Sequence, residues 1–333
     1  MSRSDLPVTA ADVAATRARI SGVAVRTPLV PSVGLSHRCG VEVGLKLESV
    51  QPTGSFKIRG ATAKLASLDP EVAARGVVTA STGNHGRAVA HVAAQLAIPA
   101  TICLSDNVPT GKVVALEALG CEVIIGGASQ AEALVAAADL VTERSATLVH
   151  PFDDVEVIAG QGTIASEILE DAPDVTTLLV PLSGGGLAAG IAVAAEAARQ
   201  PIRVVGISMR RAAVMAASLD AGHPVDLPEE ATLADSLQGG IGLDNATTFP
   251  ILAALLDEVV LLDEQAIWDG MRYAFDEHRL VLEGGGAVGI AALLHGAVDV
   301  SSDQRVVIVA SGANAEPAHV VALAGGDHSP PVG

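Results

Sequence analysis

GVVTASTGNHGRAVAHVAAQLAIPATICL, residues 76–104, contains two short runs of apolar and β-branched residues separated by an Ala-rich segment. The runs at 76–80 and 100–104 predict strands, and the stretch 86–96 between them predicts a helix. Two strands joined through a helix indicate a βαβ unit, in which the strands are parallel. The polar residues 81–86 would then lie at the carboxyl end of the first strand.

The same alternation continues along the chain in two series, the second of which begins after His150-Pro151. We therefore expect an α/β protein of two lobes, each a mostly parallel sheet flanked by helices. The small lobe would be residues 76–148, inserted into a large lobe of residues 1–75 and 149–325, with a flexible tail at 326–333. Further helices are expected at 110–119, 130–143, 160–170, 187–199 and 263–278, and further strands at 122–125, 177–182, 203–207 and 305–310.

Composition excludes several classes of function. Of the 333 residues, half are apolar and 17% are charged, so a large core can form. The formal net charge is −18, from 20 basic and 38 acidic residues, and such a surface repels phosphate backbones and anionic lipids. We expect no nucleic-acid or membrane binding. The N-terminus lacks the apolar core of a secretory signal, and three cysteines without metal-ligand spacing suit a cytoplasmic protein.

One of only four lysines stands in a distinctive context. PTGSFKIRGA, residues 52–61, places Lys57 after a Gly-Ser turn and Phe56, at the start of an expected helix. A lysine in an apolar pocket has a lowered pKa, which makes its amine able to form imines and to act as a base. An ordinary surface lysine at a helix start is the alternative that these residues leave open.

Two further segments are junctions between an expected strand and an expected helix, and each exposes backbone N–H groups at the helix N-terminus. TASTGNHG, residues 79–86, runs into a helix and suits a carboxylate, although a hydroxyl helix cap with a structural His85 explains it as well. PLSGGGLAAG, residues 181–190, could wrap a phosphate. It lacks the spacing of a dinucleotide fingerprint and the lysine of a P-loop, so a single phosphate monoester fits better. IVASGAN, residues 308–314, is by itself a plain strand end.

Together, in this order, the four junctions resemble the serine/threonine dehydratase branch of the fold-type II pyridoxal-phosphate (PLP) enzymes. The likeness runs from about Arg26 to Asn314. It implies a tryptophan-synthase-beta-like fold, PLP as cofactor, a small amino acid as substrate and a homodimer. It also implies an ammonia-lyase that removes the β-hydroxyl of a β-hydroxy-α-amino acid and yields a 2-keto acid and ammonia. An amino-acid racemase and a non-catalytic ligand-binding relative are the alternatives.

The resemblance implies a role for each matching position. Lys57 would hold PLP as a Schiff base and take the Cα proton, and Thr82 would stand on the opposite face of the ring. Three residues would contact the ring, namely Phe56, Asn84 at its 3′-oxygen and Ser311 at its nitrogen, with Glu283 close by. Backbone N–H groups of Ser183, Gly184, Gly185, Gly186 and Leu187 would bind the phosphate. Ser81, Thr82, Gly83 and His85 would surround the substrate carboxylate.

Two departures from the family pattern affect function. Some members bind a cation through carboxylates at positions that match Ser208 and Val214 here, so we predict no metal. Racemases carry a serine where this chain has Thr82, and racemisation is therefore disfavoured.

A third departure concerns the substrate. The segment LADSLQGGIGLDN, residues 233–245, has Ala-Asp-Ser where most members have Ala-Asp-Gly, and it resembles the hydroxyectoine-utilisation dehydratases. Hydroxyectoine itself has no free α-amine, so its ring must open before such an enzyme can act on it. The substrate is thus predicted to be either L-threonine or L-serine, or a 3-hydroxy-2,4-diaminobutyrate derived from hydroxyectoine.

Overall fold

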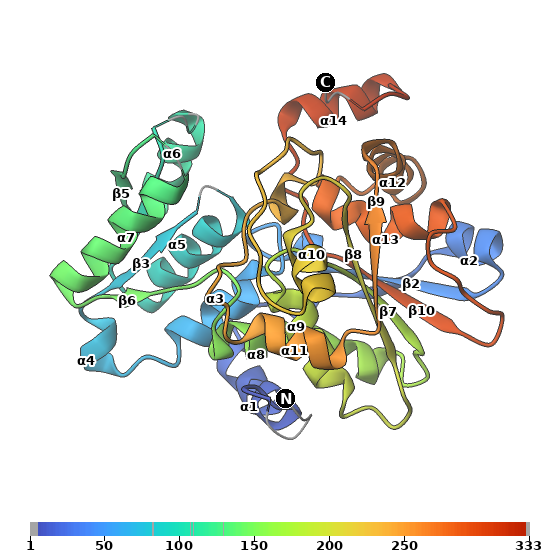
Figure 1. Cartoon of the computed structure of the whole chain (residues 1–333), viewed down its shortest axis with the longest axis horizontal. Coiled ribbons are helices and arrows are strands. Elements are labelled where there is room, and N and C mark those ends of the chain that lie inside the picture. Colours follow the sequence, from blue (N-terminus) through green and yellow to red (C-terminus); the bar gives the residue numbers. More distant parts are fainter. Residues whose placement is uncertain (1–5, 82, 107, 109, 129, 331–333) are drawn as a thin grey trace.

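The computed structural model describes residues 6–330, apart from positions 82, 107, 109 and 129 (Figure 1). Two separate sheets, one of six strands and one of four, are each flanked by helices. The expectation of an α/β protein with two lobes is confirmed. The exact lobe boundaries and the flexible tail stay predictions. Within the described residues, no helix is long and apolar enough to cross a membrane.

The four-stranded sheet is parallel throughout and is built from one continuous part of the chain, in the order β5-β4-β3-β6. Side chains on successive strand positions point to opposite faces, so alternate apolar residues enter two different cores. Val77 and Ile102 contact the cluster beneath α5, whereas Val78 and Cys103 contact the cluster beneath α7. The elements are β3 (Val77–Ala80), α5 (Asn84–Leu96), β4 (Ala100–Leu104), α6 (Thr110–Glu117), β5 (Glu122–Ile125), α7 (Gln130–Arg144) and β6 (Thr147–Leu148).

The six-stranded sheet joins the two ends of the chain. Its order is β1-β2-β10-β7-β8-β9, and only β1 is antiparallel to its neighbour. Strand β2, from the N-terminal part, pairs in parallel with β10, so residues about 260 positions apart lie side by side. The strands are β1 (Leu29–Pro31), β2 (Glu42–Leu47), β7 (Thr177–Pro181), β8 (Arg203–Met209), β9 (Glu258–Leu262) and β10 (Arg305–Ala310).

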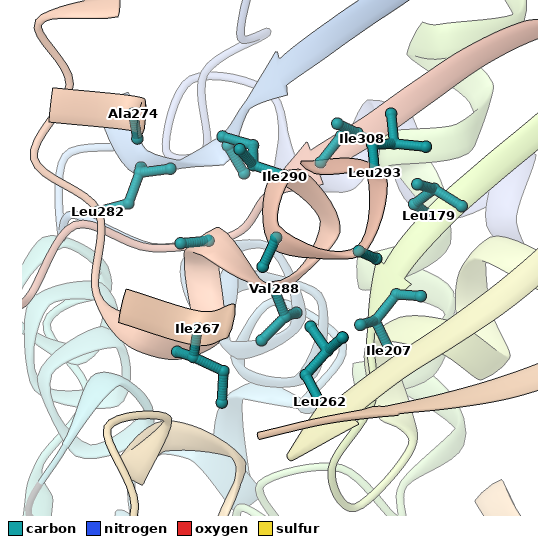
Figure 2. Close-up of a cluster of buried hydrophobic side chains, with 14 of the residues drawn as sticks. Leu179, Ile207, Leu262, Ile267, Ala274, Leu282, Val288, Ile290, Leu293 and Ile308 are labelled. Carbon is teal, nitrogen blue, oxygen red and sulfur yellow. The ribbon is translucent and has the colours of Figure 1, made fainter. Parts of the chain in front are cut away.

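Helices bury both faces of this sheet, which is why its strands are apolar on both sides. Figure 2 shows one of the two cores, where Leu179, Ile207 and Ile308 from the strands meet Val288 and Ile290 from α13. The helices on that face are α2 (Val33–Cys39), α12 (Glu264–His278) and α13 (Gly284–Leu294). Those on the other face are α1 (Ala10–Ile20), α8 (Val155–Asp171), α9 (Gly186–Ala195) and α11 (Thr248–Leu255). The remaining helices are α3 (Lys57–Leu65), α4 (Pro70–Ala73), α10 (Val214–Ala221), α14 (Pro317–Gly325) and the short 3₁₀ helices η2 (Glu48–Val50) and η3 (Asp235–Leu237).

Two helices begin two or more residues earlier than their sequence indicated. Helix α8 starts at Val155 and not at residue 160, because Asp154 caps it by accepting from the backbone N–H groups of Glu156 and Val157. Helix α5 starts at Asn84, so that Asn84 and His85 lie inside its first turn. Helix α13 was not predicted, because three consecutive glycines at its start are poor helix formers.

A buried cluster of charges attaches α3 to the large sheet. Arg59 donates to both oxygens of Glu48, at 2.8 Å each, and to both oxygens of Glu167, at 2.7 and 2.9 Å. Lys46 on β2 donates to Glu167 at 2.6 Å and to the carbonyl of Thr27. The side chains of Lys46, Glu48, Arg59 and Glu167 are at most 6% exposed. Two cations and two anions therefore balance each other in the interior and join β2, η2, α3 and α8.

Replacement of Arg59 by Met would leave the carboxylates of Glu48 and Glu167 buried with only Lys46 as a cation. We expect a loss of about 3–5 kcal/mol in the free energy of unfolding, measured by urea denaturation. The matched control is Arg17→Met, which breaks an exposed pair with Glu170 and should cost no more than about 1 kcal/mol. Equal effects of the two substitutions would contradict a stabilising role for the cluster.

Candidate active site

The loop before α3 is joined to the end of β10. The backbone N–H of Phe56 donates to the carbonyl of Ser311 at 3.0 Å, and the N–H of Ala313 donates to the carbonyl of Gly54 at 2.8 Å. Gly54 has φ +75°, and a side chain there would approach Asn314 Oδ1 to 2.7 Å. Two of the four sequence junctions therefore lie in contact, with Ser311 directly beside the residue that precedes Lys57.

Lys57 is the first residue of α3, and its side chain is directed into the molecule. The Nζ atom donates to the carbonyl of Pro151 at 2.8 Å and lies 5.3 Å from the centre of the Phe56 ring. Burial lowers the pKa of Lys57 to about 8, although the nearby carboxylate of Glu283 opposes this shift. A substantial fraction of the amine is thus neutral near pH 7.5, as a nucleophile or base requires. An ordinary surface lysine does not fit this geometry.

Three amide and carboxylate groups connect the small lobe to the large one. Asn84, on the first turn of α5, donates through Nδ2 to Glu283 Oε1 at 2.7 Å. Asn314 donates through Nδ2 to Asn84 Oδ1 at 2.5 Å and to the carbonyl of Thr53 at 3.0 Å. Arg87 donates to Asn314 Oδ1 at 2.7 Å. The Asn84 amide is thereby held in one orientation, and its Nδ2 has a second hydrogen to donate.

Glu283 lies at the N-terminus of α13 and is only 4% exposed. Burial raises the pKa of its carboxyl group, and the hydrogen bond from Asn84 acts in the opposite direction. The segment after β10 passes directly over it: a side chain at Gly312 would lie 2.5 Å from Glu283 Oε1. Glu283 therefore faces Lys57, Asn84 and the end of β10 at once.

The glycine run follows β7 and opens α9. Gly185 has φ +93°, which favours glycine, and a side chain there would come within 2.6 Å of Leu252. A side chain at Gly184 would lie 2.3 Å from the ring of Phe152. No side chain in the described part of the protein caps the N-terminus of α9. The first N–H groups of α9 thus have no partner within the helix, and they suit an anion such as a phosphate.

These residues fit PLP. A monophosphate suits the backbone of Ser183, Gly184 and Gly185 together with the first residues of α9, Gly186 and Leu187. Lys57 supplies an amine with a lowered pKa. Ser311 is buried, and among the described residues its hydroxyl has one long contact, of 3.5 Å to the carbonyl of Gly285, so it can still serve a ring nitrogen.

The predicted carboxylate-binding loop is partly described. Thr82 lies outside the described residues. Ser81 Oγ accepts from the N–H of Gly83 at 3.4 Å, and Gly83 is exposed. His85 is buried, its pKa is lowered to about 3 chiefly by burial, and its Nε2 lies 2.9 Å from the carbonyl of Val149. His85 is thus a neutral side chain that holds α5 to the segment after β6, and its contact with substrate stays a prediction.

The loop after β6 was not identified from the sequence as part of the site. Pro151 accepts from Lys57, and Phe152 packs against Gly184 and Gly186. His150 Nδ1 accepts from the N–H of Asp153 at 2.8 Å, and its ring lies edge-on to Phe152 at 4.6 Å. The Asp153 carboxylate accepts from the N–H groups of Thr247 and Thr248 at the start of α11. The consecutive residues Asp153 and Asp154, which precede α8, are the feature of the sequence that could have indicated this loop.

The lowered pKa of Lys57 gives a pH prediction. A neutral amine is needed to attack the aldehyde of PLP, and a group with a pKa of about 8 is neutral above that pH. The rate at which the visible band appears when PLP is added to the apoprotein should therefore rise from pH 6, reach half of its maximum near pH 8 and level off above that pH. A rate that continues to climb toward pH 10.5 would show that burial does not lower the pKa of Lys57.

Gly184→Ala should weaken the binding of PLP about tenfold or more, because the new methyl group meets the Phe152 ring and displaces the loop. Pyridoxal, which lacks the phosphate, should lose much less affinity, and equilibrium titration of the visible band gives both constants. Gly325→Ala is the control, since a side chain there would have no atom within 4 Å. Equal losses for PLP and pyridoxal would disprove phosphate binding at this loop.

Comparison with known proteins agrees with this site. The family model described as pyridoxal-phosphate dependent enzyme matches residues 20–312. A Sinorhizobium fredii protein assigned as a threonine dehydratase is 51% identical over 90% of both chains. The L-threonine ammonia-lyase of Geobacter sulfurreducens is 41% identical over 86% of this chain and 71% of its own length. Maize serine racemase superimposes with a TM-score of 0.89 and 34% identity over 94% of this chain and 96% of its own.

The tryptophan-synthase-beta-like fold and the PLP cofactor predicted from the sequence are confirmed. The hydroxyectoine subgroup remains a prediction, because the relatives named above are threonine dehydratases, threonine ammonia-lyases and a serine racemase. With Lys57, the glycine loop and Ser311 at the carboxyl ends of its strands, this chain belongs to the serine/threonine dehydratase family of fold-type II PLP enzymes, and it is a lyase of the threonine dehydratase type.

Proposed function

We propose that this enzyme converts L-threonine, and more slowly L-serine, to the corresponding 2-keto acid and ammonia. The observation that carries the proposal is the Lys57 amine, which has a lowered pKa and lies 2.8 Å from Pro151, next to the Phe152 ring that supports the glycine loop. A reactive amine and a phosphate-binding backbone thus share one wall of the site. The reaction balances for threonine. Elimination of the β-hydroxyl releases one water, and the later hydrolysis to the keto acid and ammonia consumes one.

We assign the cofactor contacts as follows. Lys57 forms the covalent link, and Phe56 packs beside the ring. Ser183, Gly184, Gly185, Gly186 and Leu187 bind the phosphate through their N–H groups. Asn84, oriented by Asn314, donates its second amide hydrogen to the 3′-oxygen, and Ser311 meets the ring nitrogen. Glu283 lies beside the ring, and Ser81, Thr82, Gly83 and His85 surround the substrate carboxylate.

When bound, PLP supplies an electron sink that acidifies the Cα–H bond of the amino acid. Lys57, released from its covalent link, takes the Cα proton, since its neutral amine is accessible near pH 8. Ser311 offers a hydroxyl, which donates a hydrogen bond to the ring nitrogen but does not transfer a full proton. A ring nitrogen held by a hydroxyl would withdraw less charge from Cα than a protonated one, and this would favour loss of the neighbouring hydroxyl over return of the proton.

A diamino substrate derived from hydroxyectoine is the second candidate. The segment that suggested it, residues 234–236, lies against the start of α13, where a side chain at Gly285 would come within 2.4 Å of Ser236 Oγ. The unusual serine therefore lies beside the first turn of the helix that Glu283 precedes. Racemisation is a third candidate, which the likeness to maize serine racemase supports.

The deciding experiment offers L-threonine, L-serine and 3-hydroxy-2,4-diaminobutyrate separately to the PLP-loaded enzyme. We expect keto acid and ammonia in equal amounts, with the highest kcat/KM for threonine. A higher kcat/KM for the diamino acid would move the assignment to the hydroxyectoine-derived substrate. Release of D-amino acid without keto acid would establish a racemase and reject the proposal.

Lys57→Ala should lower the turnover of threonine by about 10²–10⁴-fold, because it removes the base. Lys64→Ala, on the same helix, breaks only an ion pair with Asp154 and should keep activity within about twofold. Similar activity of the two variants would rule out Lys57 as the catalytic base.

A further inference from the structure

The glycine loop between β7 and α9 is held between two different segments of the chain. On one side lies Phe152, whose ring would be 2.3 Å from a side chain at Gly184. On the other side lies α11, since a side chain at Gly185 would be 2.6 Å from Leu252 and 3.1 Å from Thr248. Helix α11 also packs against α9, which the glycine loop opens (Figure 1). The position of the loop is therefore determined by Phe152 and by α11 together.

Asp153 joins these two segments. It follows Phe152 directly in the chain, and its carboxylate accepts from three consecutive backbone N–H groups at the start of α11. The distances are 3.1 Å to Ala246, 2.9 Å to Thr247 and 2.7 Å to Thr248. A carboxylate in this place satisfies N–H groups that have no partner within the helix, and it also interacts favourably with the helix dipole. Asp153 therefore caps α11 although it lies 94 positions before Thr247 in the chain.

The segment that carries Asp153 is itself fixed in place. The N–H groups of Phe152 and Asp153 donate to His150 Nδ1, at 3.3 and 2.8 Å. The next residue, Asp154, caps α8 and forms an ion pair with Lys64 on α3 at 2.5 Å. Because this segment is attached to α3 and α8, the cap that Asp153 provides also fixes the start of α11 relative to those two helices.

We propose that Asp153 is a positioning residue for the cofactor phosphate, because by capping α11 it holds that helix against the glycine loop. Asp153 acts through α11 and is not assigned a contact with PLP or with substrate. The inference rests on the phosphate contacts of the proposed function, and not on the identity of the substrate. Without the cap, the loop would have to be ordered as the phosphate binds, and the cost of that ordering would reduce affinity.

The test measures the affinity of the Asp153→Ala apoprotein for PLP, pyridoxal and inorganic phosphate. Titration of the visible band gives the first two constants, and competition with PLP gives the third. Loss of the cap should weaken the binding of PLP and of inorganic phosphate by about tenfold each. Pyridoxal should change by less than about twofold. A displaced Lys57 would instead weaken PLP and pyridoxal alike, since both react with the same amine.

Two further variants serve as matched controls. Asp153→Asn keeps an oxygen that can accept from Thr247 and Thr248, and asparagine caps helices about as well as aspartate, so phosphate affinity should stay within about twofold of the wild type. Asp263→Ala removes the cap of α12 on the opposite face of the large sheet, where its carboxylate accepts from the N–H of Ala266 at 2.8 Å. It should lower the melting temperature about as much as Asp153→Ala does, but leave all three affinities unchanged.

Unchanged affinities in Asp153→Ala, or equal weakening of PLP and pyridoxal, would overturn the proposal. A comparable loss of phosphate affinity in Asp263→Ala would do the same, since it would show a general effect of lost stability. The Asn variant keeps the test decisive even where the Ala variant does not fold, because weak phosphate binding in a variant that retains the cap contradicts the proposal.

These measurements use no substrate, so a wrong substrate assignment would leave them intact. A wild-type protein that binds PLP no more tightly than pyridoxal would refute the phosphate site of the proposed function, and this inference with it. A wild type that prefers PLP, together with an Asp153→Ala variant that prefers it equally, would refute the inference alone.

Discussion

The structure depends on a buried balance of charge around Arg59. Glu48 and Glu167 both accept from its guanidinium, and Lys46 neutralises the remaining charge, so that two cations and two anions are removed from water together. Such a cluster tolerates little displacement, since an unpaired buried charge is very costly. Arg59 lies two residues after Lys57 on the same helix. The interaction that anchors α3 between β2 and α8 therefore also determines where the reactive lysine stands.

Close backbone approach is the second constraint, and glycine makes it possible. Gly184 and Gly186 admit Phe152 next to the phosphate loop, while glycines 284–286 admit η3 and Gly312 next to Glu283. Each run opens a helix, α9 or α13, whose N-terminus lies at the carboxyl end of the large sheet. The glycines thus bring distant loops within reach of the site, and the run that opens α9 leaves backbone N–H groups at a helix N-terminus, which suit an anion.

The electrostatics of the site arise from burial more than from formal charge. Burial lowers the pKa of Lys57 and of His85 and raises that of Glu283, so each group shifts toward its neutral form. The hydrogen bond from Asn84 opposes that shift at Glu283. The outcome is a lysine that can act as a nucleophile and base near neutral pH, beside a carboxylate whose charge is controlled by its donors. Ser311, which is buried at the end of β10, is the neutral group that we propose for the ring nitrogen.

The sequence by itself determined the α/β class and the PLP family, and it indicated Lys57 and the glycine loop as candidates for the site, because these depend on local periodicity and on short motifs that keep their meaning in isolation. It did not reveal the loop from His150 to Asp153, the role of Asn314 or the hydrogen bond of Asn84 to Glu283. Those interactions join residues up to about 260 positions apart. Only the tertiary structure decided them, since parallel sheets bring the carboxyl ends of strands together regardless of their distance along the chain.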